Sequence, residues 1–177
     1  MALLVNLYGG PGSGKSTMMA SIFAELKCRH VKCEMATEFA KEKLWEKSLG
    51  VFENQIYMFG KQMHAIHRVV DKVDVVITDS PILLSRIYAP YETKTFHDFV
   101  TEVSKRYNNF NVFLQRSSAE YDPEGRFQTE DEAIEKDVEI KNLLESIGEP
   151  YTIFPADRST APMLVDEIVN KLQNEKQ

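Results

Sequence analysis

The sequence has few cysteines, no long apolar run and no excess of basic residues. Its two cysteines, Cys28 and Cys33, are too few for a disulfide framework. They flank the start of an expected strand, and we interpret both as reduced, packed side chains. We expect no membrane span or secretory signal, because the N-terminal apolar stretch is short and lacks a basic flank. We therefore expect a cytoplasmic protein without membrane contact.

The shortage of basic residues argues against a protein that grips long nucleic acid. The net charge is −6, and binding to a nucleic-acid backbone depends mostly on Lys and Arg that neutralise phosphates. Residues 1–90 carry eleven basic against nine acidic residues, whereas residues 91–177 carry ten against eighteen. The basic surplus therefore lies in the first half of the chain, where a local basic groove stays possible.

The most specific pattern lies at residues 9–16, which read Gly-Gly-Pro-Gly-Ser-Gly-Lys-Ser. This is typical of a phosphate-binding loop, in which glycines let main-chain N–H groups turn toward an anion at a helix N-terminus. A strand-like apolar run precedes it and an amphipathic pattern follows. We expect Lys15 to reach the β- and γ-phosphates and Ser16 to ligate Mg²⁺. The residues assigned to nucleotide binding are Gly10, Pro11, Gly12, Ser13, Gly14, Lys15, Ser16 and Thr17.

Apolar runs of strand length alternate with helical patterns, which predicts an α/β fold with a parallel sheet covered by helices. The length of 177 residues and 43% hydrophobic content suit one domain over residues 1–177. The expected strands cover residues 3–8, 31–35, 74–78, 110–114 and 151–154. The first expected helices cover residues 37–48, ended by Gly50, and residues 53–70. The core stripe of the second is Ile56, Phe59, Met63, Ile66 and Val70.

Three further helices are expected in the second half of the chain. The first has helical spacing at Phe96, Phe99, Val100 and Val103. Residues 129–132 read Thr-Glu-Asp-Glu, a capping box that begins the next helix, which Gly148 ends. Pro162 suits the first turn of the last helix. Residues 116–128 lack periodicity, and we interpret about residues 116–129 as a lid segment.

Two acidic residues are candidates for work beside the phosphates. Asp79 ends an apolar run at the edge of the sheet where ligands bind, and we assign it to holding Mg²⁺ or orienting the acceptor. Glu38 follows the second strand, and a carboxylate there would serve as general base for an attacking hydroxyl. Its alternative role is a first-turn acid stabilised by the helix N-terminus. Glu34 is the reserve for the base.

Arg116 and Arg126 bracket most of the lid segment. Arginines that close over the site would stabilise the negative charge of phosphoryl transfer, whereas the alternative is two exposed arginines on a surface loop. Arg86 and Arg68 are weaker candidates of this kind, and Arg86 is also assigned to acceptor binding. The four histidines show no spacing typical of a metal site.

Gln55 and Tyr57 stand at the start of the helix that leads to the third strand. An amide beside an aromatic ring would read the edge of a base and stack on its face, and we assign both residues to the acceptor. The alternative is a surface glutamine next to a partly buried tyrosine.

With these motifs the chain resembles small P-loop kinases of the nucleoside and ribosylnicotinamide kinase type, including compact phage-encoded relatives labelled as AAA ATPases. The supporting motifs are the phosphate loop and residues 37–42, 54–57, 78–81 and 121–126. The resemblance implies a three-layer P-loop NTPase fold, with a five-stranded parallel sheet in the order 2-3-1-4-5 and helices on both faces.

The same resemblance implies roles for particular residues. It implies a base at Glu38, an acceptor-reading Gln55, a lid bearing Arg126, and a loop at residues 155–157 near adenine. Deoxynucleoside kinases typically follow the third-strand acid with Arg, whereas here Ser80 follows Asp79. The identity of the acceptor therefore stays open.

We expect a phosphotransferase that uses ATP and Mg²⁺ to phosphorylate a hydroxyl of a nucleoside-like or nucleotide-like acceptor. One alternative is a phage-type kinase for 5-hydroxymethyl pyrimidines in DNA, acting in the host cytoplasm, with a rim that contains Trp45, Lys41, Lys43 and Lys47. Another is an ATPase regulated by a protein partner, in which Glu38 positions water. The oligomeric state is open.

Overall fold

Five strands form one parallel sheet in the computed structural model, which describes residues 1–116 and 129–174. The strands are β1 (Leu3–Tyr8), β2 (Cys33–Ala36), β3 (Val75–Thr78), β4 (Asn108–Gln115) and β5 (Thr152–Pro155). Their spatial order is β2-β3-β1-β4-β5, and every neighbouring pair is parallel. The expected sheet order and fold class are therefore confirmed.

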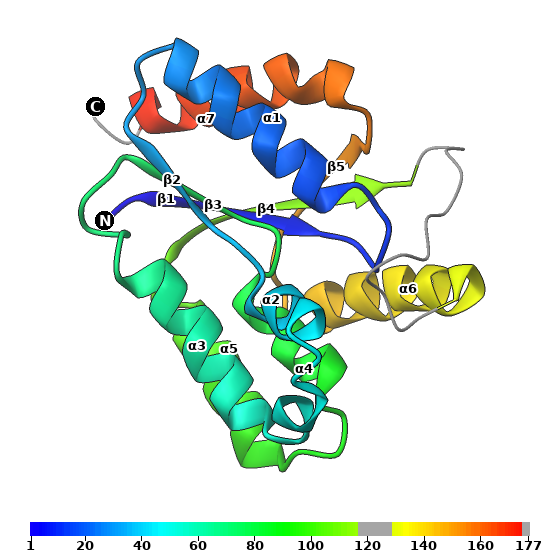
Figure 1. The fold of residues 1–177 in the computed structure, drawn as a ribbon. Coiled ribbons are helices and arrows are strands. Elements are labelled where there is room, and N and C mark those ends of the chain that lie inside the picture. Colours follow the sequence, from blue (N-terminus) through cyan, green and yellow to red (C-terminus); the bar gives the residue numbers. More distant parts are fainter. Residues whose placement is uncertain (117–128, 175–177) are drawn as a thin grey trace.

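Helices cover both faces of this sheet (Figure 1). The helices are α1 (Lys15–Cys28), α2 (Phe39–Trp45), α3 (Gln55–His67), α4 (Ser85–Tyr88), α5 (Lys94–Ser104), α6 (Glu130–Ser146) and α7 (Ala161–Asn174), with 3₁₀ turns η1 (Leu49–Glu53), η2 (Ile82–Leu84) and η3 (Arg158–Thr160). Helices α1 and α7 pack on one face, whereas α3, α5 and α6 pack on the other. Among the described residues no helix has the length and apolar character needed to cross a membrane.

Side chains of β1 alternate between two separate cores. Leu3, Val5 and Leu7 are buried with side chains of α1 and α7, whereas Leu4 and Tyr8 are buried with those of α3, α5 and α6. The strand is buried on both faces, which explains its continuous apolar sequence. The sheet therefore separates the two cores.

A ladder of asparagines, in which Asn6 and Asn111 are buried and Asn109 is partly buried, joins β1 to β4. Asn6 Nδ2 donates to the side-chain oxygens of Asn109 at 2.9 Å and Asn111 at 3.0 Å. Asn111 Nδ2 in turn donates to the carbonyl of Pro150 at 3.1 Å. Because buried amides are costly without partners, this ladder stabilises the observed register of the two central strands.

The segment after β2 differs from the expected helix over residues 37–48. Helix α2 ends at Trp45, and Gly50 lies inside the 3₁₀ turn η1 instead of ending a helix. The actual stop is Lys47, which adopts a left-handed φ of 56° while Ser48 N–H donates to the Lys43 carbonyl. Glycine usually occupies such a position, so the lysine at position 47 gave no sequence signal for the end of the helix.

Several apolar positions are more exposed than expected. Ile56 is 62% exposed, so the predicted core stripe of α3 is wrong at its first position, although Phe59, Ile66 and Val70 are buried. Phe99 is 45% exposed. Cys28 is exposed and Cys33 is buried, so the expectation that both are packed is wrong for Cys28, which lies at the solvent-facing end of α1.

The predicted signals at the ends of α6 are confirmed. Thr129 Oγ1 accepts from the Glu132 N–H, and the Glu132 carboxylate accepts from the Thr129 N–H, which completes the capping box. Gly148 follows the helix with a left-handed φ of 70°. Helix α6 therefore begins immediately after the capping threonine, close to the phosphate loop (Figure 1).

Candidate functional site

The phosphate-binding pattern forms the turn between β1 and α1, at the carboxyl edge of the sheet (Figure 1). Gly12 and Gly14 have φ angles of 75° and 84°, which residues with a Cβ rarely adopt. Gly14 is the N-cap of α1 and provides no side-chain cap. The first N–H groups of α1 are therefore available as donors to an anion, which the helix dipole also favours.

The ammonium group of Lys15 lies over this loop. Lys15 Nζ donates to the carbonyls of Gly9 at 2.7 Å and Gly10 at 2.9 Å. Burial lowers the pKa of Lys15, while the negative charges of Glu38 and Asp79 oppose that shift. Lys15 therefore interacts electrostatically with Glu38 and Asp79, the two carboxylates that the sequence analysis predicted to lie beside the phosphates.

Ser16 and Asp79 form the arrangement expected for a magnesium site. Ser16 Oγ donates to Asp79 Oδ2 at 2.7 Å, and Asp79 is only 3% exposed at the end of β3. Asp79 Oδ1 is buried without a hydrogen-bond partner among the described residues. Hydroxyl and carboxylate oxygens suit Mg²⁺, which usually takes one or two protein ligands plus phosphates and water. The described part of the chain contains no cluster of three or more His, Cys, Asp or Glu side chains that could hold a metal ion. A magnesium site made of one hydroxyl, one carboxylate, phosphates and water does not require such a cluster.

Glu38 is the N-cap residue of α2, but its side chain makes no capping hydrogen bond to the helix. Burial raises the pKa of Glu38, the charge of Lys15 lowers it, and the charge of Asp79 raises it again. A carboxyl group with a raised pKa beside a phosphate site has the properties of a general base. Glu34, the reserve, is exposed and lies 3.6 Å from Lys27, away from this group.

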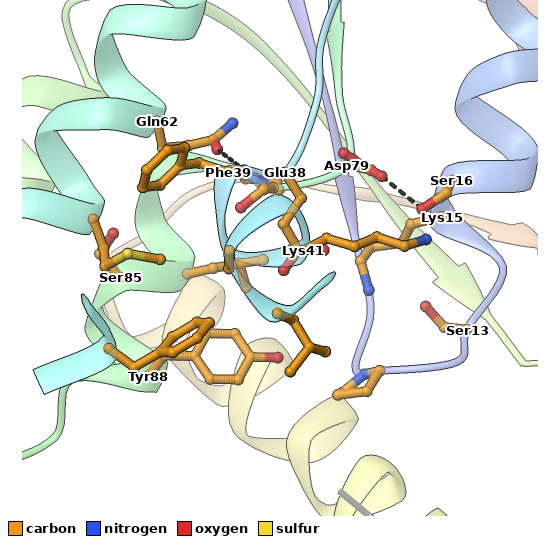
Figure 2. A pocket seen from close by; sticks show the side chains of 18 of the residues that line it. Ser13, Lys15, Ser16, Glu38, Phe39, Lys41, Gln62, Asp79, Ser85 and Tyr88 are labelled. Carbon is orange, nitrogen blue, oxygen red and sulfur yellow. Dashed lines mark hydrogen bonds between the residues drawn. The ribbon is translucent and has the colours of Figure 1, made fainter. Parts of the chain in front are cut away.

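One cavity of about 630 Å³ extends from the phosphate loop across α2 to α3 and α4. Residues 11–17, Glu38 and Asp79 line one end. Figure 2 shows Lys15, Ser16 and Asp79 on one side of the view and Gln62, Ser85 and Tyr88 on the other. The large apolar side chains that line the cavity include Phe39, Leu44, Leu49, Phe52, Met58 and Leu84. The cavity therefore joins a charged end to a mostly apolar end.

Of the four residues assigned to acceptor binding, Glu38 and Gln55 line the cavity, whereas Tyr57 and Arg86 do not. Gln55 lines the cavity, and its Nε2 donates to the Phe52 carbonyl at 2.7 Å. Tyr57 is 41% exposed and lies outside this cavity. Arg86 is also absent from the lining, because its Nη1 donates to Thr101 Oγ1 on α5 at 2.8 Å.

Gln62 and Tyr88 are among the cavity residues that the sequence reasoning missed. Gln62 lies seven residues after Gln55 on α3, a spacing that places both on one helix face and could have revealed it. Its side chain accepts from the Phe39 N–H at 3.2 Å and donates to Thr78 Oγ1 at 3.3 Å, so it holds the backbone next to Glu38. Tyr88 lies on α4, a four-residue helix without a sequence signal, and burial raises the pKa of its hydroxyl.

Arg116 lies against the phosphate loop. Its guanidinium donates to the Pro11 carbonyl at 2.7 Å and to the Asp137 carboxylate at 2.5 Å. The alternative of an exposed arginine is wrong for Arg116, whose side chain is 19% exposed. Arg126 and most of the lid segment lie outside the described residues. Arg68 is exposed, and its Nε donates to the nearby Ala65 carbonyl at 3.4 Å.

The proposed DNA rim and the proposed adenine loop have distinct positions. Trp45 is 60% exposed and Lys43 pairs with Glu46, whereas Lys41 lines the cavity. On the other side of the phosphate loop, a Cβ built on Gly14 would lie 3.5 Å from the Cβ of Ala156. The loop after β5 is therefore a neighbour of the first turn of α1.

Comparisons with known proteins match most of the chain. The profile described as an AAA domain matches residues 4–160. A crystal structure of NadR protein in complex with NR is similar to this chain with a TM-score of 0.67 and 16% identity, covering 93% of this chain and 51% of that chain. A NadR structure with NAD and AMP-PNP has a TM-score of 0.67 and 15% identity, covering 98% and 50%.

The chain spans about half the length of the NadR structures that it matches, and at such identity the similarity shows the fold. No curated protein matches the sequence.

Proposed function

The chain belongs to the AAA domain family of phosphate-loop proteins, and we propose that it is an ATP- and Mg²⁺-dependent kinase for the hydroxyl group of a nucleoside. The observation that carries this proposal is the single cavity that joins the phosphate loop, Glu38 and an apolar pocket. Hydrolysis of ATP alone requires room only for water. A volume of about 630 Å³ is instead in the range of sites that hold a small organic ligand.

The residues support in-line transfer of the γ-phosphate. Lys15 and the loop amides bind the polyphosphate, while Ser16 and Asp79 would hold Mg²⁺, which neutralises charge on the phosphates. Glu38 accepts the proton of the acceptor hydroxyl while the oxygen of that hydroxyl bonds to the γ-phosphorus. The bond from that phosphorus to the β,γ-bridging oxygen breaks, and ADP leaves.

The charge of the cavity favours a nucleoside over a nucleotide as acceptor. The cationic side chains among its described lining residues are Lys15 and Lys41, and Lys15 lies over the phosphate loop. A phosphate on the acceptor would add about 1.5 to 2 negative charges. Apolar and neutral polar side chains, including Gln55 and Tyr88, instead suit a planar base and sugar hydroxyls. The NadR structures with NR and with AMP-PNP are consistent with such a pair of ligands.

The proposal is tested by transfer of labelled γ-phosphate from ATP to a panel of acceptors. The panel contains nucleosides, nucleoside monophosphates, ribosylnicotinamide and oligonucleotides with hydroxymethylated pyrimidines. We expect label on a nucleoside, which includes ribosylnicotinamide. Label on an oligonucleotide would overturn the nucleoside assignment in favour of a DNA kinase. Label only in free phosphate would overturn kinase activity and favour a partner-regulated ATPase.

A pair of variants tests the role of Glu38 in the same assay. Glu38→Gln should lose transfer, because the amide does not accept the proton of the acceptor. Glu34→Gln is the matched control, since Glu34 is exposed and outside the cavity lining. Full transfer by Glu38→Gln would remove Glu38 from the proposed mechanism.

A further inference from the structure

The first part of the phosphate loop, at Gly10, contacts helix α6 directly and is hydrogen-bonded to it. The Gly10 N–H donates to Asp137 Oδ1 at 2.5 Å. A Cβ built on Gly10 would lie 2.3 Å from the Ala133 carbonyl, so the loop and the α6 backbone are in direct contact. Asp137 lies one helical turn after Ala133, which places its carboxylate on the same face of α6.

Arg116 completes this connection from the end of β4. Its Nε donates to Asp137 Oδ2 at 2.5 Å, and its Nη2 donates to the carbonyls of Pro11 at 2.7 Å and Ala133 at 3.1 Å. The side chains of Arg116 and Asp137 are 19% and 14% exposed. Both carboxylate oxygens of Asp137 are thus engaged, one by the loop and one by the guanidinium.

A carboxylate in this position is unfavourable for nucleotide binding by charge alone. Its field reaches Lys15, since the charge of Asp137 raises the Lys15 pKa and that of Arg116 lowers it. A bystander carboxylate would repel a bound triphosphate. The observed contacts give Asp137 another effect, because they fix the orientation of the Gly10 peptide and hold Arg116 over Pro11.

We propose that Asp137 is a positioning residue for the triphosphate, acting by holding the Gly10–Pro11 segment and Arg116 in place. This inference rests on the proposed binding of ATP but not on transfer to an acceptor. Preorganised donors bind an anion more tightly than donors that must first be ordered. Loss of the carboxylate should therefore weaken nucleotide binding even though it removes a repulsive charge.

The test measures binding of Mg²⁺ and AMP-PNP by calorimetry, without acceptor, to the full chain and its variants. We expect Asp137→Ala to bind about tenfold more weakly, the scale of one charge-assisted hydrogen bond. Asp137→Asn keeps an oxygen for the Gly10 N–H and should recover part of the loss. Glu139→Gln is the charge-matched control, because Glu139 lies on the same helix and pairs with Lys136 instead of the phosphate loop.

The outcomes separate positioning from charge and from folding. Tighter or unchanged binding by Asp137→Ala would overturn the proposal, because a bystander charge predicts that result. In a double-mutant cycle with Arg116→Ala the two losses should be less than additive, and additive losses would also count against positioning. Thermal unfolding of each variant excludes loss of the fold as the cause. Wild-type binding without phosphoryl transfer would refute the kinase function and leave the Asp137 result intact, whereas no wild-type binding would overturn both.

Discussion

A single methyl group at Gly10 should destabilise the protein and weaken nucleotide binding. In Gly10→Ala the new Cβ would lie 2.3 Å from the Ala133 carbonyl and 2.9 Å from Arg116 Nη2. Overpacking of this kind costs about 1–3 kcal/mol. A shift that relieves the contact would stretch the Gly10 to Asp137 hydrogen bond, whose charged acceptor makes it worth about 1.5–3 kcal/mol. The smaller entropy of the unfolded alanine chain offsets about 0.4–1 kcal/mol.

The clash and the shift are alternative outcomes, so only one of these two costs applies. Either cost, less the offset, leaves a net loss of about 1–2 kcal/mol for Gly10→Ala, which corresponds to a fall in Tm of roughly 2–8 °C for a chain of this size. Gly60→Ala makes the same chemical change inside α3, where the new Cβ meets no atom within 4 Å. Helix propensity should make that variant about 0.5–1 kcal/mol more stable. Urea denaturation gives both free energies. Gly10→Ala with wild-type stability and wild-type nucleotide affinity would refute the close contact between the loop and α6.

The other predictions concern the reacting groups. Because burial raises the folded pKa of Glu38, the stability tied to its protonated form is present below the unfolded value of about 4.3 and is lost as pH rises through the folded pKa. Glu38→Gln should therefore raise Tm relative to wild type at neutral pH but not near pH 4; a lower Tm at neutral pH would contradict this. Ser16→Ala should raise the Mg²⁺ concentration for half-maximal transfer at least about tenfold, whereas Ser16→Thr, which keeps the hydroxyl, should not. Tyr88→Phe should raise the KM for the acceptor about 2- to 10-fold with no change in the KM for ATP, as steady-state kinetics would show.

The phosphate loop and the strands could be predicted because they depend on local sequence. Glycines before a Lys-Ser pair, and apolar runs bounded by polar residues, have the same meaning in any surrounding fold. The sheet order came from family resemblance, and the observed order confirms it. The end of α2 was missed because Lys47 adopts a left-handed conformation that its residue type does not indicate.

Much of the acceptor side depends on contacts between distant segments. Gln62 is hydrogen-bonded to Phe39 and Thr78, which lie on two other elements. Tyr88 belongs to a four-residue helix, which is too short to show a periodic apolar pattern. In the sequence Asp137 is not distinguishable from the other acidic residues of α6, because only the folded chain brings it close to Gly10. Neither Tyr57 nor Arg86 lines the cavity, and Arg86 instead donates to Thr101 on α5.

The division of the interior by the sheet has an evolutionary consequence. Side chains such as Ile22 beneath α1 and Phe59 beneath α3 belong to separate packing neighbourhoods. Substitutions on the two sides should have nearly additive effects on stability, because they share no partners. Under the proposed function, substitutions beneath α3 can therefore alter the acceptor side of the cavity while the packing beneath α1, which begins at the phosphate loop, is preserved.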